Sequence, residues 1–211
     1  MKKLEKKPLI ICVCMILIQS VSYLFVKLLQ GQTHLIGSTL DNSIPFINYF
    51  IIFYCLWYVL LFFVPYYLYI KDKNMFTKYI ISYTLAVFIS SIIFIIYPTE
   101  VIRPLLNNNN LLDIITNLIY KVDTPAINCL PSMHCAICTL FIISLSISKK
   151  SNNVIKIIIN IMSILIMLST LFVKQHVIID ALTGIVMMSI IFIYVNYNNR
   201  IVNKVKKLLN I

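Results

Sequence analysis

The chain is poor in charged residues, in acidic residues and in glycine. Of its 211 residues, 12% are charged, only seven are aspartate or glutamate, and three are glycine. A soluble domain usually carries about 25% charged residues, so a soluble globular protein is excluded. The few carboxylates form no cluster that would hold a metal ion, and no internal repeat is present.

Long apolar runs dominate what remains, because 60% of the residues are hydrophobic. Each run has about 20 residues, enough for a helix to cross the roughly 30 Å hydrocarbon core of a bilayer. The alternating pattern of an outer-membrane barrel is missing, and backbone groups in lipid must bond internally, so we expect helices. We therefore predict an all-α, polytopic membrane protein, a single domain over residues 1–211 with six transmembrane helices. The expected spans are Leu9–Leu29, Phe46–Ile70, Tyr79–Tyr97, Leu130–Ile147, Val154–Val173 and Val177–Tyr197.

The net charge of +11 indicates membrane topology and not a nucleic-acid partner. Most cations fall on one side of the six-span arrangement, which the positive-inside rule assigns to the cytoplasm together with both termini. These cations are Lys2, Lys3, Lys6, Lys7, Lys71, Lys73, Lys78, Lys149, Lys150, Lys156, Arg200, Lys204, Lys206 and Lys207. Richness in isoleucine, lysine and asparagine favours a bacterial plasma membrane.

Rare polar residues gather at the opposite, non-cytoplasmic ends of the spans. They occur in "YPTEVIRP" (97–104), "LPSMH" (130–134) and "STLFVKQHVIID" (169–180). An ionisable group inside a span costs about 2.5–3.5 kcal/mol at its centre, so such groups normally face a polar cavity or one another. We expect the three segments to converge on one site. The alternative is that these residues merely cap helices at the interface.

His176 and Asp180 are spaced i, i+4 at the start of the last span. On a helix this spacing places both side chains on one face. A carboxylate beside an imidazole fixes its tautomer and leaves the other ring nitrogen free as a nucleophile or base.

Arg103 and Lys174 add two cations on the same side. A guanidinium offers fixed N–H donors that suit phosphate or carboxylate oxygens. Together with the histidines they predict a pocket for an anionic head group. Snorkelling of Arg103 to lipid phosphates is the alternative.

The stretch "NCLPSMHCAIC" (128–138) contains three cysteines and His134. Pro131 and Ser132 suit the first turn of a helix, whose free N–H groups attract an oxyanion, and His134 would project from the same end. A zinc site would need paired spacings and a second Cys/His pair. Because that side holds no second Cys/His pair apart from His176, we favour acid–base chemistry over a metal.

At these residues the chain resembles the phosphatidic acid phosphatase type 2 (PAP2) superfamily of membrane lipid phosphatases and phosphotransferases. The family signature is K-x6-R-P, then P-S-x-H, then S-R-x5-H-x3-D. The matching residues, within 97–184, are Arg103-Pro104, Pro131-Ser132-Met133-His134, and Ser169 with His176 and Asp180.

The resemblance implies a role for each matching residue. His176 would attack phosphorus and become a phosphohistidine, Asp180 would orient it, and His134 would be the general acid and then the base. Arg103, Ser132 and the backbone around Met133 would hold the phosphate, without a metal or another cofactor.

The chain departs from the signature at two cations. Ile96 and Thr170 stand where the family has lysine and arginine. Lys174 is the natural substitute for one of them. The form "KQHVIID" resembles the branch that includes inositol-phosphorylceramide synthase.

One further helix is expected between the first and second signature segments. Apolar residues within 111–121 recur at helical spacing, which predicts an interfacial helix beside the site or else a packing segment.

The leading function is hydrolysis of a lipid phosphate or pyrophosphate, such as isoprenoid pyrophosphate or phosphatidic acid, at the non-cytoplasmic face. The alternatives are a lipid phosphotransferase and a non-catalytic transporter or membrane binding protein. Asp123 is expected only to begin the turn before Pro125, and His34 to lie in a solvated loop.

Overall fold

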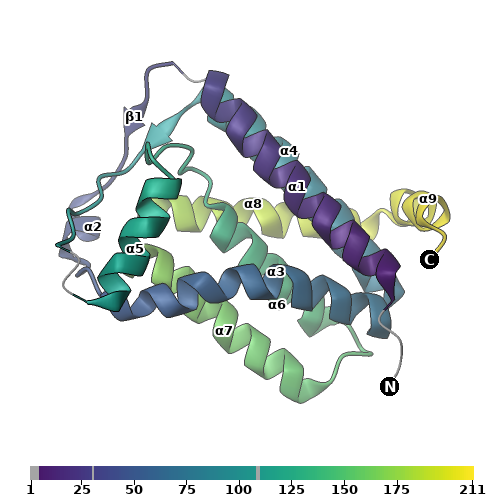
Figure 1. Ribbon diagram of the computed structural model, residues 1–211. Helices are drawn as coiled ribbons and strands as arrows, with labels where there is room; N and C mark the ends of the chain where they lie inside the picture. Colours follow the sequence, from purple (N-terminus) through teal and green to yellow (C-terminus); the bar gives the residue numbers. More distant parts are fainter. Residues whose placement is uncertain (1–4, 30, 108–109) are drawn as a thin grey trace.

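The computed structural model describes residues 5–29, 31–107 and 110–211, which fold into a helical bundle (Figure 1). Lys2 and Lys3, which contribute to the predicted topology, lie outside these residues. The longer helices are α1 (Lys6–Leu29), α3 (Ile51–Lys71), α4 (Lys73–Ile96), α6 (Met133–Ile147), α7 (Asn153–Phe172) and α8 (Ile178–Tyr197). The shorter elements are β1 (His34–Leu35), α2 (Thr39–Ser43), η1 (Asn48–Phe50), β2 (Thr99–Glu100), α5 (Leu111–Val122) and α9 (Asn199–Leu209).

Helix α6 forms the centre of the bundle and packs against α4, α7 and α8. All side chains from Cys135 to Phe141 are buried. A helix that is apolar on every side lies either in a protein core or against lipid, and α6 is covered by its neighbouring helices. The outer helices instead expose large apolar side chains, such as Leu24 of α1 and Ile157 of α7.

The polytopic all-α fold is confirmed, with one difference at α6. In the part of the chain that the structure describes, five helices are long and apolar enough to cross a membrane, namely α1, η1 with α3, α4, α7 and α8. Helix α6 has 15 residues and a length of about 22 Å, less than the roughly 30 Å hydrocarbon core. It begins at Met133 and not at Leu130, because Ser132 is its N-cap. The count of six spans stays a prediction.

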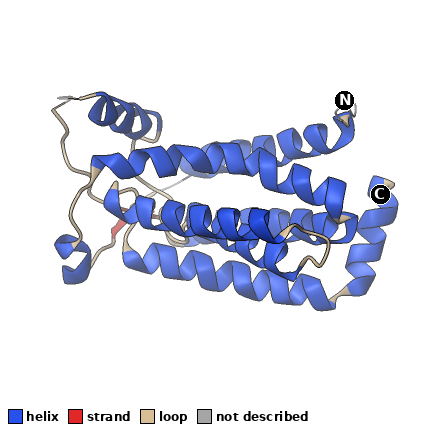
Figure 2. Ribbon diagram, turned by 90° about the horizontal axis from the view of Figure 1, so that it is seen from below, coloured by secondary structure: helices blue, strands red, loops and turns tan. Residues whose placement is uncertain are grey.

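The chain termini lie together at one end of the bundle (Figures 1 and 2). Lys7 Nζ donates to the carbonyl oxygen of Asn210 over 3.2 Å. At this end α9 lies across the bundle and buries Val202 against it, while its basic residues follow α8 directly. This helix was not expected from the sequence. That the end faces the cytoplasm stays a prediction.

The opposite end is formed by β1, β2, α2 and α5 (Figure 1). The two short strands pair in parallel, with His34 opposite Thr99, and the ring of His34 stacks on Tyr97 at 4.5 Å between centroids. Helix α5 confirms that residues 111–121 are helical. One face of α5, including Ile115 and Ile119, packs against Tyr54 and its neighbours, whereas the face with Leu118 is exposed.

Candidate active site

His176 and Asp180 form a contact at the start of α8. His176 lies two residues before this helix, and Nδ1 of its ring is 3.2 Å from Oδ2 of Asp180. The same oxygen accepts the backbone N–H of Val177 at 3.1 Å. His176 thus lies before the helix and not on its first turn, as the spacing had suggested. The pair forms because the Asp180 side chain reaches back over the N-terminus of α8. Because the carboxylate accepts, Nδ1 carries the proton and Nε2 keeps its lone pair.

Asp180 is fully buried. Its second oxygen, Oδ1, has no hydrogen-bond partner among the residues that the structure describes. An ionised carboxylate away from water is stabilised by each donor that it meets, which favours its bond to the imidazole N–H.

His134 lies in the first turn of α6, between two aromatic rings of α3. Its ring centroid is 4.3 Å from that of Trp57 and 4.6 Å from that of Tyr54. The His134 and His176 rings are 5.7 Å apart at an angle of 60°. Within the described part of the chain, the buried Nε2 of His134 has no partner. The structure thus brings the two histidines together with room for a hydrogen-bonding group.

The starts of α6 and α8 are joined directly, and this contact positions both histidines. The N–H of Ser132 donates to the carbonyl oxygen of Asp180 at 3.0 Å, and Ser132 Oγ caps α6 by accepting from the N–H of Cys135. Gly184 permits the approach, because a Cβ there would lie 2.3 Å from the carbonyl oxygen of Ser132. Ser132 is itself fully buried, and Met133 begins the helix beside it.

Arg103 reaches the same region but is already paired. Its guanidinium contacts Oδ2 of Asp123 at 2.5 Å, and it donates to the side chain of Gln175 and to the carbonyl oxygen of Asp123. The guanidinium also lies over the ring of Tyr120, 5.0 Å from its centroid. A phosphate that binds Arg103 must therefore compete with one carboxylate.

Lys174 points in another direction. Its Nζ donates to the carbonyl oxygens of Asp41, at 2.9 Å, and Ile44, at 2.5 Å. Its backbone has φ +52°, in the left-handed region. Its predicted part in phosphate binding stays a prediction.

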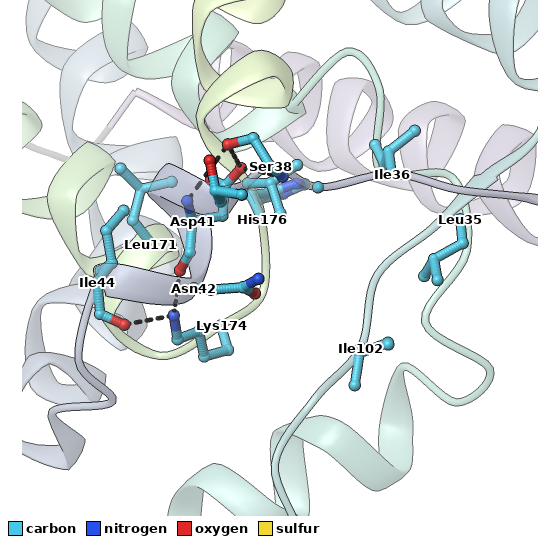
Figure 3. A pocket seen from close by; sticks show the side chains of 13 residues that line it. Leu35, Ile36, Ser38, Asp41, Asn42, Ile44, Ile102, Leu171, Lys174 and His176 are labelled. Carbon is cyan, nitrogen blue, oxygen red and sulfur yellow. Dashed lines mark hydrogen bonds between the residues drawn. The ribbon is translucent and has the colours of Figure 1, made fainter.

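Two cavities meet at His176. The larger has a volume of about 630 Å³ and is walled by apolar and aromatic side chains of α1, α3, α4 and α5, with His134, Arg103 and Asp123 also lining it. The smaller has about 420 Å³ and lies beside α2, where the polar side chains of Lys174, Asp41 and Asn42 line it together with the aliphatic ones of Leu35, Ile36, Ile44, Ile102 and Leu171 (Figure 3).

The sequence did not reveal several residues of this site. Asp123 and Gln175 contact Arg103 from 20 and 72 residues away, so no local spacing indicates either contact. From the sequence, Tyr54 and Trp57 are indistinguishable from aromatic residues that anchor a membrane span. Only Trp57 stands out, because it is the single tryptophan of the chain.

The cysteines of 128–138 pack separately. Cys129 Sγ contacts the carbonyl oxygen of Ala126, Cys135 Sγ lies 3.9 Å from Thr170 Oγ1, and Cys138 is buried. Across residues 5–29, 31–107 and 110–211, no three histidine, cysteine or acidic side chains are grouped closely enough to hold a metal ion.

Comparison with known proteins gives one match. The sequence model of the PAP2 superfamily matches residues 28–194, a range that includes both histidines, Asp180 and Arg103. No curated protein and no solved structure matches the chain.

Proposed function

The chain belongs to the PAP2 superfamily, and from this premise we propose that it removes phosphate from a membrane lipid through a phosphohistidine at His176. The superfamily supports a phosphatase or phosphotransferase acting on lipid phosphates. The observation that carries the proposal is the pair of histidine rings, 5.7 Å apart and inclined at 60°, one of them held by a buried carboxylate.

The first chemical step uses both rings. The lone pair of His176 Nε2 forms a bond to phosphorus while the bond from phosphorus to the lipid oxygen breaks. His134 gives a proton to that oxygen, and the lipid alcohol leaves. Asp180 stabilises the positive charge that develops on His176.

The second step reverses the roles. A water oxygen attacks phosphorus from the side that the alcohol left, His134 takes the proton of the water, and the bond to His176 Nε2 breaks. The products are inorganic phosphate and the starting enzyme. The same ring can serve both steps because its proton returns to it.

Charge on the transferring phosphoryl group needs positioned donors. Arg103 lines the larger cavity together with both histidines. The N–H groups of Met133 and His134 open α6, and the first N–H groups of a helix have no intrahelical partner. We propose that Arg103 exchanges the carboxylate of Asp123 for a phosphate oxygen, and that Ser132 and the Met133 backbone face the same group.

The larger cavity suits the lipid part of the substrate. Its apolar walls come from four helices, and Ile115 and Leu118 of α5 are among the lining residues. Burial of about 25 cal/mol per Å² of apolar surface would hold an acyl or isoprenoid chain beside the histidines. We propose that the site serves the non-cytoplasmic face of a bacterial plasma membrane, since the basic residues lie mostly toward the end with the termini.

Single alanine variants of the three histidines test the proposal. His176→Ala and His134→Ala should each lower the release of phosphate from a panel of lipid phosphates in detergent by at least a thousandfold, as loss of a nucleophile or its proton donor does. His34→Ala is the matched control, because His34 lies on exposed β1 and stacks on Tyr97. Activity near the wild-type rate in either of the first two variants would remove the catalytic assignment.

Transfer to a second lipid is the other candidate function. The smaller cavity favours it, because a second space of about 420 Å³ beside His176, lined by both polar and aliphatic side chains, exceeds what phosphate needs. A radiolabel that appears on a second lipid, and not as free phosphate, would identify the transferase. A transporter or binding protein would show neither product, yet would still bind the lipid.

A further inference from the structure

Helix α9 has one apolar and one polar side. On a helix that turns 100° per residue, its apolar residues fall within an arc of about 120°. These residues are Ile201, Val202, Val205, Leu208 and Leu209. The remaining arc holds asparagine and basic residues, namely Asn199, Arg200, Asn203, Lys204, Lys206 and Lys207. The helix is therefore amphipathic.

The bundle covers only part of the apolar side. Val202 is 1% exposed, and Ile201 and Val205 are partly buried against the core. Leu208 is instead 79% exposed. Val202 and Leu208 are six residues apart in the chain, which places them about 120° apart around the helix. The apolar side is thus wider than its contact with the bundle, and the residues that the structure describes leave Leu208 uncovered.

Exposed cations border this uncovered part. Arg200 and Lys204 precede Leu208 by eight and four residues, so the three side chains follow one another on successive turns. Lys207 lies beside them, and all three cations are exposed; we call Arg200, Lys204 and Lys207 the basic edge. Within the described part of the chain, no carboxylate forms an ion pair with the basic edge. Its positive charge is therefore not neutralised by the protein.

The direction of α9 matches the plane of a membrane surface. Figures 1 and 2 both show it crosswise to α8, which it follows directly, and it packs against α4 and α8. Both of these helices are long and apolar enough to span a membrane. A helix that lies across the ends of two spans is parallel to the bilayer surface. Amphipathic helices in this position bury their apolar side at the boundary between head groups and acyl chains.

We propose that α9 binds the anionic phospholipids of the adjacent leaflet. Leu208 enters the boundary of the acyl chains, and the basic edge contacts lipid phosphates. Basic side chains can lay their aliphatic part along an apolar surface while the charge reaches the head groups. The predicted topology places this end at the cytoplasmic leaflet, whose negative surface attracts lysine and arginine. The proposal does not depend on the chemistry at His176.

A tryptophan on either side of α9 tests its orientation. Leu208→Trp places the probe on the uncovered apolar part, and Asn203→Trp, at an exposed position on the polar side, is the matched control. Each full-length protein is reconstituted into vesicles with brominated acyl chains, which quench tryptophan fluorescence on contact. The wild-type protein gives the baseline from Trp57, the single native tryptophan. Above this baseline, Leu208→Trp should be quenched at least twice as strongly as Asn203→Trp. Equal quenching of both variants, or none above the baseline, would overturn the proposal.

The Leu208→Trp protein also measures the preference for anionic lipid. The vesicles contain equal amounts of phosphatidylglycerol and phosphatidylcholine, with bromine on one lipid or on the other. Phosphatidylglycerol should bind beside α9 about threefold or more tightly than phosphatidylcholine, because three cations lie near the surface. Salt at about 0.5 M should remove most of this preference by screening. Equal quenching by the two brominated lipids would contradict the binding of anionic lipid.

Removal of charge from the basic edge completes the test. Lys204→Gln with Lys207→Gln, added to Leu208→Trp, should remove most of the preference for phosphatidylglycerol. Lys149→Gln with Lys150→Gln is the matched control, because these two cations are exposed in the turn after α6 and lie outside α9. A preference that survives the first pair of changes, or falls equally with both pairs, would show that α9 is not the binding surface. Unfolding temperatures equal to that of the wild type confirm that both variants fold.

Discussion

The two cavities at His176 pair their cations in different ways. In the larger, apolar cavity Arg103 contacts the side-chain carboxylate of Asp123. In the smaller cavity, which has a mixed polar and aliphatic lining, Lys174 donates to two main-chain carbonyls of the α2 segment. A phosphate can take the place of the Asp123 carboxylate at Arg103, because both groups are anions. It cannot bind Lys174 without breaking the hydrogen bonds that hold α2. Arg103 is therefore the better placed of the two to bind phosphate.

The largest effect is expected where both cavities depend on one residue. Asp180→Asn keeps the size of the side chain but favours the wrong imidazole tautomer at His176. The rate of phosphate release from lipid phosphates should fall by roughly 10³- to 10⁴-fold. Asp113→Asn, at an acidic residue outside both cavities, is the control. A rate near that of the wild type in Asp180→Asn would contradict the orienting role of Asp180.

Gly184→Ala should disrupt the frame of both cavities. The added Cβ would meet the carbonyl oxygen of Ser132 at 2.3 Å, so α6 and α8 must separate. We expect a loss of about 1–3 kcal/mol in the free energy of unfolding, measured by denaturation in detergent. Gly31→Ala is the control, because nothing lies within 4 Å of its added Cβ. Equal stability of the two variants would contradict the packing role.

Asp123→Asn tests the exchange of anions in the apolar cavity. Without the carboxylate, Arg103 is free to bind phosphate, and KM for a lipid phosphate should fall about tenfold, equivalent to about 1.4 kcal/mol, with kcat little changed. Initial rates over a range of lipid concentration measure both constants. A rise in KM would mean that Asp123 holds Arg103 in its binding position.

Lys174→Met tests the smaller cavity. If Lys174 mainly supports α2, the variant should lose about 1 kcal/mol in the free energy of unfolding for the lost bonds, measured by denaturation in detergent, while KM for phosphatidic acid stays unchanged. A large rise in KM for phosphatidic acid would instead show that Lys174 binds phosphate, as the sequence suggested.

The smallest effect is expected from removal of metal. Incubation with a chelator should leave the rate of phosphate release from lipid phosphates unchanged, because histidine and arginine supply the chemistry. Loss of activity that zinc restores would revive the metal interpretation of residues 128–138, and Cys135→Ala would then identify the ligand.

The long helices, and the proximity of the candidate site residues His134 and His176, could be predicted because their signals are local. Apolar runs mark the helices, and Ser132 with His134, or His176 with Asp180, lie within a few positions of each other. The start of α6 was misplaced by three residues, since Ser132 caps the helix after Pro131. Helix α9 was missed, because its basic residues were interpreted only as topology signals.

The pairings could not be predicted, because they join distant positions. Asp41 lies 133 residues from Lys174 along the chain, and the contact forms only when α2 packs over the loop before α8. Asp123 likewise contacts Arg103 only because the turn after α5 places the two side chains together. In each case the partner is chosen by which loops meet at one end of the bundle.

The order of residues was enough to specify a helical membrane protein and the candidate histidines, since both follow from hydropathy and short spacing. Packing of α2, α5 and the starts of α6 and α8 settled the rest: which partners Arg103 and Lys174 bind, and how the space around His176 divides into two cavities. Such choices depend on side chains brought together across the whole chain, and each buried charge takes whichever partner that packing provides.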